Sequence, residues 1–176
     1  MDQIRLREPL SLQDVTAYSL VAALAGSPYR MLQVSAGHTL VPRLRAAASR
    51  KTAVGLLRRE AVLMVGVSAL AAPVLFWLTP RIIEWIAGAA IDNGYMLTAA
   101  VIVVGFVRLW EGLAAAVVNA IGTPRQLLLM SVLGWVAIAI AVALSSCASH
   151  NGLVAVVFGL GAGWGAIAIG ATALAF

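Results

Sequence analysis

Two charged residues, Arg108 and Glu111, stand near the middle of an apolar stretch that runs from Tyr95 to Ile121. Such a stretch is long enough to cross a bilayer as one helix, which takes about 20 residues. Charged side chains at that depth cost at least ~2.5 kcal/mol each, so they normally face protein or water rather than lipid. Residues three apart share a helix face, so this Arg and Glu can pair with each other. Alternatively, the guanidinium can bind phosphate oxygens through its fork of donors, and the carboxyl can exchange a proton.

Three further polar residues lie inside apolar segments and are candidates for the same chemistry. Arg30 is, with Arg108, one of two cations well inside the expected spans. Its alternative role is to reach the headgroups at the membrane surface. Gln33 and Asn119 are polar enough to touch sugar hydroxyls, and interhelical hydrogen bonding is their alternative role.

Helical periodicity gives the Tyr95–Ile121 stretch two different faces, at about 100° per residue. Polar and small residues fall on one side: Thr98, Gly105, Arg108, Glu111, Gly112, Ala115 and Asn119. Larger apolar residues fall on the other: Val103, Phe106, Trp110, Leu113 and Val117. We therefore expect the first side to line a polar space and the second to face lipid.

The composition places the chain among integral membrane proteins. Of its 176 residues, 62% are hydrophobic and 11% are charged, and the mean hydropathy is +0.97. An average soluble domain has roughly 45–50% apolar and ~25% charged residues. The net charge of +5 predicts no nucleic-acid partner, because the basic residues are few and localised, and it is typical of the positive-inside rule. The single cysteine, Cys147, excludes an intramolecular disulfide and a cysteine-cluster metal site.

The hydrophobic pattern predicts one all-α membrane domain over residues 1–176, with about five transmembrane helices. They cover residues 15–37, 61–78, 95–121, 126–144 and 153–176. Pro28 should kink the first helix, and Thr79-Pro80 should close the second, leaving an amphipathic connection before Gly94. Glycines repeat through the last helix, which indicates close packing against its neighbours.

Charge asymmetry predicts the orientation in the membrane. Residues 38–60 carry six Arg or Lys residues against one Glu, so this connection should be cytoplasmic. The connections at residues 80–94 and 145–152 lack such an excess and fall on the other side. The N-terminus is then outside and the C-terminus is cytoplasmic.

The order of these features resembles one family. The segments that carry the resemblance are LSLQDVTAYSLVAAL, LVPRLR with its basic connection, LTPRIIEWIAGAAIDNGY and NAIGTPRQ. These segments resemble the C-terminal part of bacterial oligosaccharide flippases. The matching positions are Tyr18 at the entry to a span, Pro42 at its close, and Pro80, Gly88 and Tyr95 around an external connection. The flippases are lipopolysaccharide-biosynthesis membrane proteins of the superfamily of multidrug, oligosaccharidyl-lipid and polysaccharide exporters. Such proteins have two bundles of about six helices, so the resemblance implies an incomplete second bundle whose first bundle is missing.

The resemblance implies a transport function in the bacterial inner membrane. The substrate would be an undecaprenyl-diphosphate-linked oligosaccharide, moved to the periplasmic leaflet for polysaccharide or lipopolysaccharide assembly. Its path would include five residues: Arg30, Gln33, Arg108, Glu111 and Asn119. The partners would be the bilayer, the lipid-linked oligosaccharide, and a first helical bundle or another membrane subunit. The alternative is a non-transporting accessory or remnant membrane protein that needs a partner bundle.

The residue pattern does not predict an enzyme. A membrane glycosyltransferase would need carboxylates or histidines that converge in one connection, and Glu84 and Asp92 form no such acid–base pair. His38 and His150 lie at opposite ends of the expected spans, so they predict no shared metal site. A loose dinucleotide-type glycine spacing after Leu160 follows no strand, so we expect no cofactor there.

Overall fold

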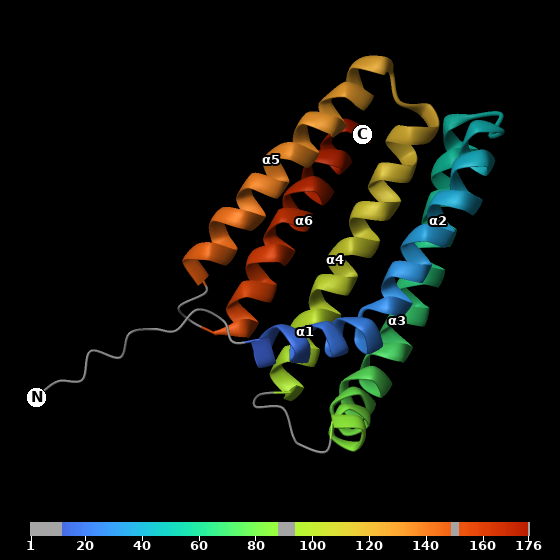
Figure 1. The fold of residues 1–176 in the computed structure, drawn as a ribbon. Helices are drawn as coiled ribbons and strands as arrows, with labels where there is room; N and C mark the ends of the chain where they lie inside the picture. Colours follow the sequence, from blue (N-terminus) through green and yellow to red (C-terminus); the bar gives the residue numbers. More distant parts are fainter. Residues whose placement is uncertain (1–11, 88–93, 149–151, 176) are drawn as a thin grey trace, which may run out of the picture.

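The computed structural model describes residues 12–87, 94–148 and 152–175. Within these ranges the regular structure is entirely α-helical, without a strand (Figure 1). The helices are α1 (Leu12–Ala25), α2 (Ser27–Arg45), α3 (Arg50–Ala87), α4 (Gly94–Ile121), α5 (Pro124–Ala148) and α6 (Leu153–Ala175). Asp92, Gly88 and His150, named above, lie outside the described residues.

Four of the described helices, α3 to α6, are long and apolar enough to cross a membrane. Their spans are Lys51–Ile86, Gly94–Ile121, Pro124–Cys147 and Leu153–Ala175. The length and composition of these helices indicate a multi-pass membrane protein. The expected spans at 95–121, 126–144 and 153–176 correspond to α4, α5 and α6, within a few residues at each end.

The expected first span, 15–37, consists of two helices that meet at Gly26. Pro28 lies in the first turn of α2, where its missing N–H is tolerated, whereas in a continuous helix its ring would clash with the preceding turn. Figure 1 shows that α1 runs across the direction of the other helices. Neither helix is among the four membrane-length apolar helices, because α1 has only 14 residues and the 19 residues of α2 are largely polar at its basic end.

The expected end of the second span at Thr79-Pro80 is wrong. Helix α3 continues through both Pro73 and Pro80 and ends at Ala87. The residues expected to form a separate amphipathic connection therefore belong in part to α3. There Arg81 lies over the ring of Trp77, with 3.8 Å between its guanidinium carbon and the ring centroid.

Helix α4 is the central element of the bundle, since it packs against α1, α2, α3 and α6. The expectation that its larger apolar residues all face lipid is only partly correct. Val103 and Trp110 are exposed, but Leu113 and Val117 are buried in a cluster with Leu40, Leu44 and Met64 of α2 and α3. The apolar side of α4 is therefore covered by protein in its C-terminal half.

Helix α6 is a packing helix, as its glycines predict, and it uses them on two faces. Gly159, Gly163 and Gly170 lie against α5, where a Cβ atom on each would approach Ser145, Ala137 or Leu133 within 3.0 Å. Gly161 lies against Val104 of α4. Small residues that remove Cβ atoms let two helices approach closely in lipid.

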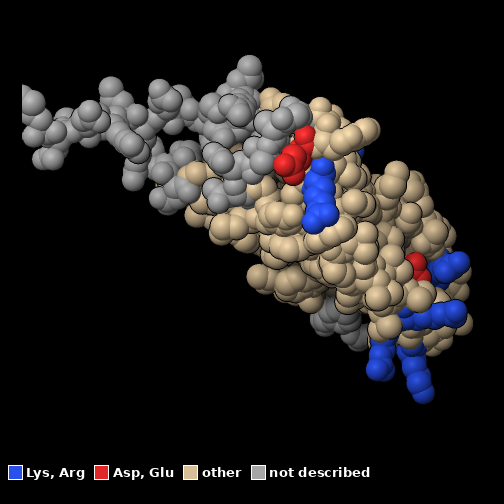
Figure 2. All heavy atoms as spheres, turned by 90° about the horizontal axis from the view of Figure 1, so that it is seen from below, with Lys and Arg blue, Asp and Glu red and all other residues tan. Residues whose placement is uncertain are grey.

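The basic residues gather at one end of the bundle. Arg43 and Arg45 lie in the last turn of α2, and Lys51, Arg58 and Arg59 are exposed at the start of α3. The α4–α5 connection and the C-terminal end of α6 lie at this same end (Figure 1). Figure 2 shows most of the visible Lys and Arg side chains at one end of the molecule, with one further basic side chain beside acidic atoms away from that end. The rest of the visible described surface is largely uncharged. We refer to the ends of α2 and α3 at residues 43–59 as the basic end.

Candidate functional site

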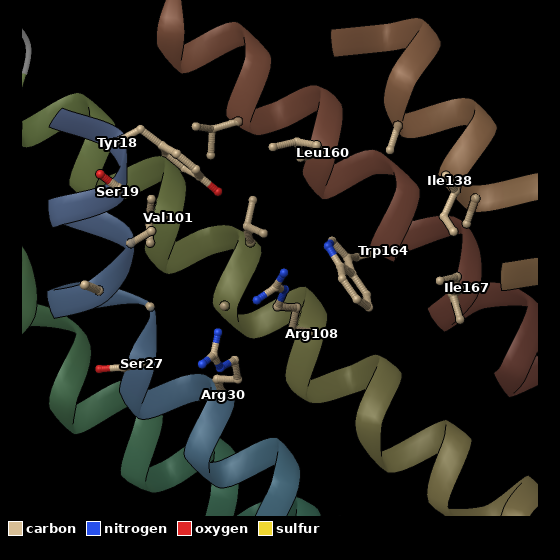
Figure 3. Close-up of a pocket in the computed structure, with 18 of the residues that line it drawn as sticks. Tyr18, Ser19, Ser27, Arg30, Val101, Arg108, Ile138, Leu160, Trp164 and Ile167 are labelled. Carbon is tan, nitrogen blue, oxygen red and sulfur yellow. The ribbon is translucent and has the colours of Figure 1, made fainter. Parts of the chain in front are cut away.

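A cavity of about 880 Å³ lies between α1, α2, α4, α5 and α6 (Figure 3). Ligand cavities in proteins typically measure roughly 300–1,000 Å³, so this one is large enough for a drug-sized molecule or a lipid headgroup. Small and aliphatic residues make up most of the lining, including Ala22, Val104, Ala137, Ile138 and Ile167. The described lining contains two charged residues, Arg30 and Arg108.

Close contact between α2 and α4 holds one wall of the cavity in place. The ring of Tyr29 lies directly over Gly105, so that a Cβ atom there would be 2.6 Å from the ring. Tyr29 also packs against Phe106, with 5.4 Å between ring centroids. One turn further along α2, the side chain of Gln33 crosses Gly112 of α4. A Cβ atom on Gly112 would lie 2.6 Å from the Cγ atom of Gln33. Glycine at both positions on α4 brings the two helices together and fixes the side chains between them.

Arg108 projects from α4 into the cavity toward α6. Its guanidinium carbon lies 4.5 Å from the ring centroid of Trp164 (Figure 3). A cation over an indole face is attracted by the ring quadrupole, an interaction worth about 0.5–2 kcal/mol. Within the described part of the chain, the Nε atom of Arg108 is buried without a hydrogen-bond partner. Among these residues, the guanidinium of Arg108 therefore lies against an aromatic face and forms no close ion pair, although the charge of Glu111 attracts it at longer range.

Glu111 is engaged by α2. The Nε2 atom of Gln33 donates a hydrogen bond to Oε2 of Glu111, with 2.6 Å between them. Among the described side chains, Glu111 is hydrogen-bonded to Gln33 and not to Arg108. Both residues are half-buried at the α2–α4 contact, and neither belongs to the cavity lining.

Arg30 reaches the cavity from the first turns of α2. It is exposed, and Figure 3 shows its guanidinium group directed into the same space as that of Arg108. Tyr18 of α1 and Ser27 of α2 add hydroxyl groups to this wall. Two guanidinium groups that face one apolar cavity can together bind a doubly charged anion such as a diphosphate.

The five residues of the expected path are thus separated into three places. Arg30 and Arg108 meet in the cavity, and Gln33 and Glu111 meet at the helix contact beside it. Asn119 lies far along α4, where its backbone oxygen accepts a hydrogen bond of 2.9 Å from Nη2 of Arg45. Asn119 therefore joins α4 to the basic end and does not line the cavity.

Trp164 is a residue of the site that the sequence reasoning missed. It is the large aromatic residue among Gly161, Gly163 and Gly165, in a segment interpreted only as a packing helix. A cation inside a span can be stabilised by an aromatic face as well as by a counterion, a backbone carbonyl or water. A search for an aromatic residue in a neighbouring span could therefore have found Trp164.

The helices indicate a multi-pass helical membrane protein, and between them lies a partly open, mostly apolar cavity with two cationic side chains. Comparison with known proteins gives no family model, no curated protein and no solved structure that matches this chain. The function is therefore argued from the cavity.

Proposed function

We propose that this chain is the second-bundle part of a membrane transporter for an anionic, lipid-linked substrate. The substrate class is that of an undecaprenyl-diphosphate-linked oligosaccharide, translocated across the bacterial inner membrane for polysaccharide or lipopolysaccharide assembly. The observation that supports this proposal is the presence of Arg30 and Arg108 in one otherwise apolar cavity.

The chemistry of the cavity matches the two parts of such a substrate. A diphosphate carries negative charges that pair with guanidinium groups, and the cavity offers two of them. The prenyl chain is apolar and is compatible with the aliphatic lining contributed by α5 and α6. The basic end is assigned to the cytoplasmic side, because cytoplasmic connections carry an excess of Lys and Arg.

A reconstitution experiment tests this function. The purified chain, alone and together with candidate first-bundle subunits, is placed in liposomes that contain a fluorescent undecaprenyl-diphosphate-linked sugar. We expect accelerated movement of the probe between leaflets, and its loss in R30A/R108A. Movement that is unchanged in this double variant would remove the two arginines from the substrate path.

The outer surfaces of α3 and α5 favour a second candidate function. In the apolar, membrane-length segment of α3, only 11% of the residues are buried within the chain, and in that of α5 only 6% are buried. Surfaces of this kind contact either lipid or the helices of a partner, so the chain could act as a non-transporting accessory subunit. Tight binding of the lipid-linked probe without movement, in every subunit combination, would favour this candidate.

A further inference from the structure

Among the described residues, no hydrogen bond or close ion pair joins Arg108 to Glu111, the carboxylate three positions away on the same helix, and the two charges attract each other only at longer range. Residues at this spacing share a helix face and readily form an ion pair. Glu111 instead accepts its hydrogen bond from Gln33 of the neighbouring helix, and the guanidinium of Arg108 lies against Trp164. Each of the two charged side chains is therefore held by a residue of a different neighbouring helix.

Gln33 is the residue that holds Glu111. Its side chain crosses Gly112, where its Cγ atom lies 2.6 Å from the site of a hypothetical Cβ. This close approach places the amide of Gln33 beside Glu111, to which it donates the 2.6 Å hydrogen bond. The bond fixes the carboxylate toward α2, at the helix contact and outside the cavity lining.

We propose that Gln33 is a positioning residue that keeps Glu111 from pairing closely with Arg108, so that the cavity presents the guanidinium of Arg108 to an anionic ligand. The inference rests on the proposed anionic substrate of the cavity and assigns a role to a residue that does not touch it. Without the amide of Gln33, Glu111 would turn toward Arg108 and form an ion pair. The ligand would then have to compete with a carboxylate that is permanently attached to the same helix.

The test measures binding of farnesyl diphosphate, a short prenyl diphosphate, to the detergent-purified chain by titration calorimetry. Farnesol serves as the uncharged control. Gln33→Met keeps the Cβ and Cγ atoms that pack on Gly112 and replaces the amide, with its hydrogen-bond donor, by an apolar thioether. We expect Q33M to weaken farnesyl diphosphate binding by about 10- to 100-fold, the range of a hydrogen bond to a charged group, and to leave farnesol binding unchanged.

The decisive variant is Q33M combined with Glu111→Gln. If Gln33 acts by holding the carboxylate away, removing the charge of Glu111 restores wild-type affinity in Q33M/E111Q. If Gln33 matters only for packing of α2 on α4, the second substitution restores nothing, and the inference is overturned. E111Q alone should bind at least as tightly as the wild type.

Two further outcomes separate this inference from the proposed function. Wild-type affinity in Q33M, with normal binding by the unmodified chain, contradicts the positioning role and leaves the anionic cavity intact. Absence of farnesyl diphosphate binding by the unmodified chain contradicts both. Helical circular dichroism and a wild-type elution volume for each variant show that a loss of binding does not arise from misfolding.

Discussion

The guanidinium carbon of Arg108 lies 4.5 Å from the centroid of the Trp164 ring. This contact joins α4 to α6 in the wall of the cavity and brings together residues 56 positions apart in the chain. It places a cation inside a membrane span against an aromatic face, where an exposed charge would be unfavourable. The orientation of Arg108 is therefore a property of the α4–α6 contact and not of α4 alone.

Replacement of Trp164 should weaken anion binding at Arg108. In W164A the guanidinium loses the ring that orients it and samples more conformations. We expect farnesyl diphosphate affinity to fall by about 2- to 30-fold, the equivalent of the ~0.5–2 kcal/mol of a cation–π contact. W164F keeps an aromatic face and is the matched control, with a smaller loss. Equal losses in both variants would show that the indole serves packing only.

Substitution of Gly105 should separate α2 from α4. A Cβ atom at this position would lie 2.6 Å from Tyr29, and such overpacking typically destabilises by about 1–3 kcal/mol. We expect G105A to lower the thermal unfolding midpoint in detergent. A Cβ atom on Gly66 of α3 would meet no described atom within 4 Å, so G66A should be neutral or slightly stabilising, as alanine normally is in a helix. A midpoint in G105A equal to that of G66A would contradict the close contact.

Replacement by alanine should destabilise the protein at one glycine of α6 and have little effect at another. A Cβ atom on Gly163 would lie 2.7 Å from the backbone oxygen of Ala137. A Cβ atom on Gly165 would meet no described atom closer than Val107, at 3.9 Å. Thermal unfolding should therefore show a clear loss in G163A, of about 1–3 kcal/mol, and little change in G165A. The reverse order would show that α6 is rotated relative to this packing.

The native cysteine allows a test of orientation. Cys147 is exposed near the end of α5, opposite the basic end in Figure 1. If the basic end is cytoplasmic, a membrane-impermeant maleimide should label Cys147 from outside in spheroplasts. In the C147S/S49C double variant, whose new thiol stands between α2 and α3, labelling should require permeabilised membranes. Labelling in the opposite pattern would reverse the proposed orientation.

Local sequence was sufficient to predict the helical membrane class and three of the four membrane-length helices within a few residues. Long apolar runs can satisfy their backbone hydrogen bonds in lipid only as helices, so hydropathy and length decide this outcome. The glycines of α6 likewise predicted a packing helix, because the absence of a Cβ atom is a local property.

Prolines were less informative. Pro28 lies at a helix boundary, whereas Pro73 and Pro80 lie inside α3 and Pro42 lies inside α2. A proline removes a helical hydrogen bond only inside a helix and not in its first turn, and its presence alone does not decide whether the helix ends there. Local sequence likewise does not decide the burial of Leu113 and Val117, which depends on the approach of α2 and α3.

The residue types of the candidate site were visible in the sequence, but their partners were not. Arg108 and Glu111 stand three apart, and local spacing made a mutual pair one of two expectations, beside binding of phosphate by Arg108. Side chains from α2 and α6 take the place of that mutual pair: Gln33 engages Glu111, and Trp164 engages Arg108. Which charge faces the cavity depends on contacts between residues 56 to 78 positions apart in the chain. Only the packing of α4 between α2 and α6 brings those residues within reach.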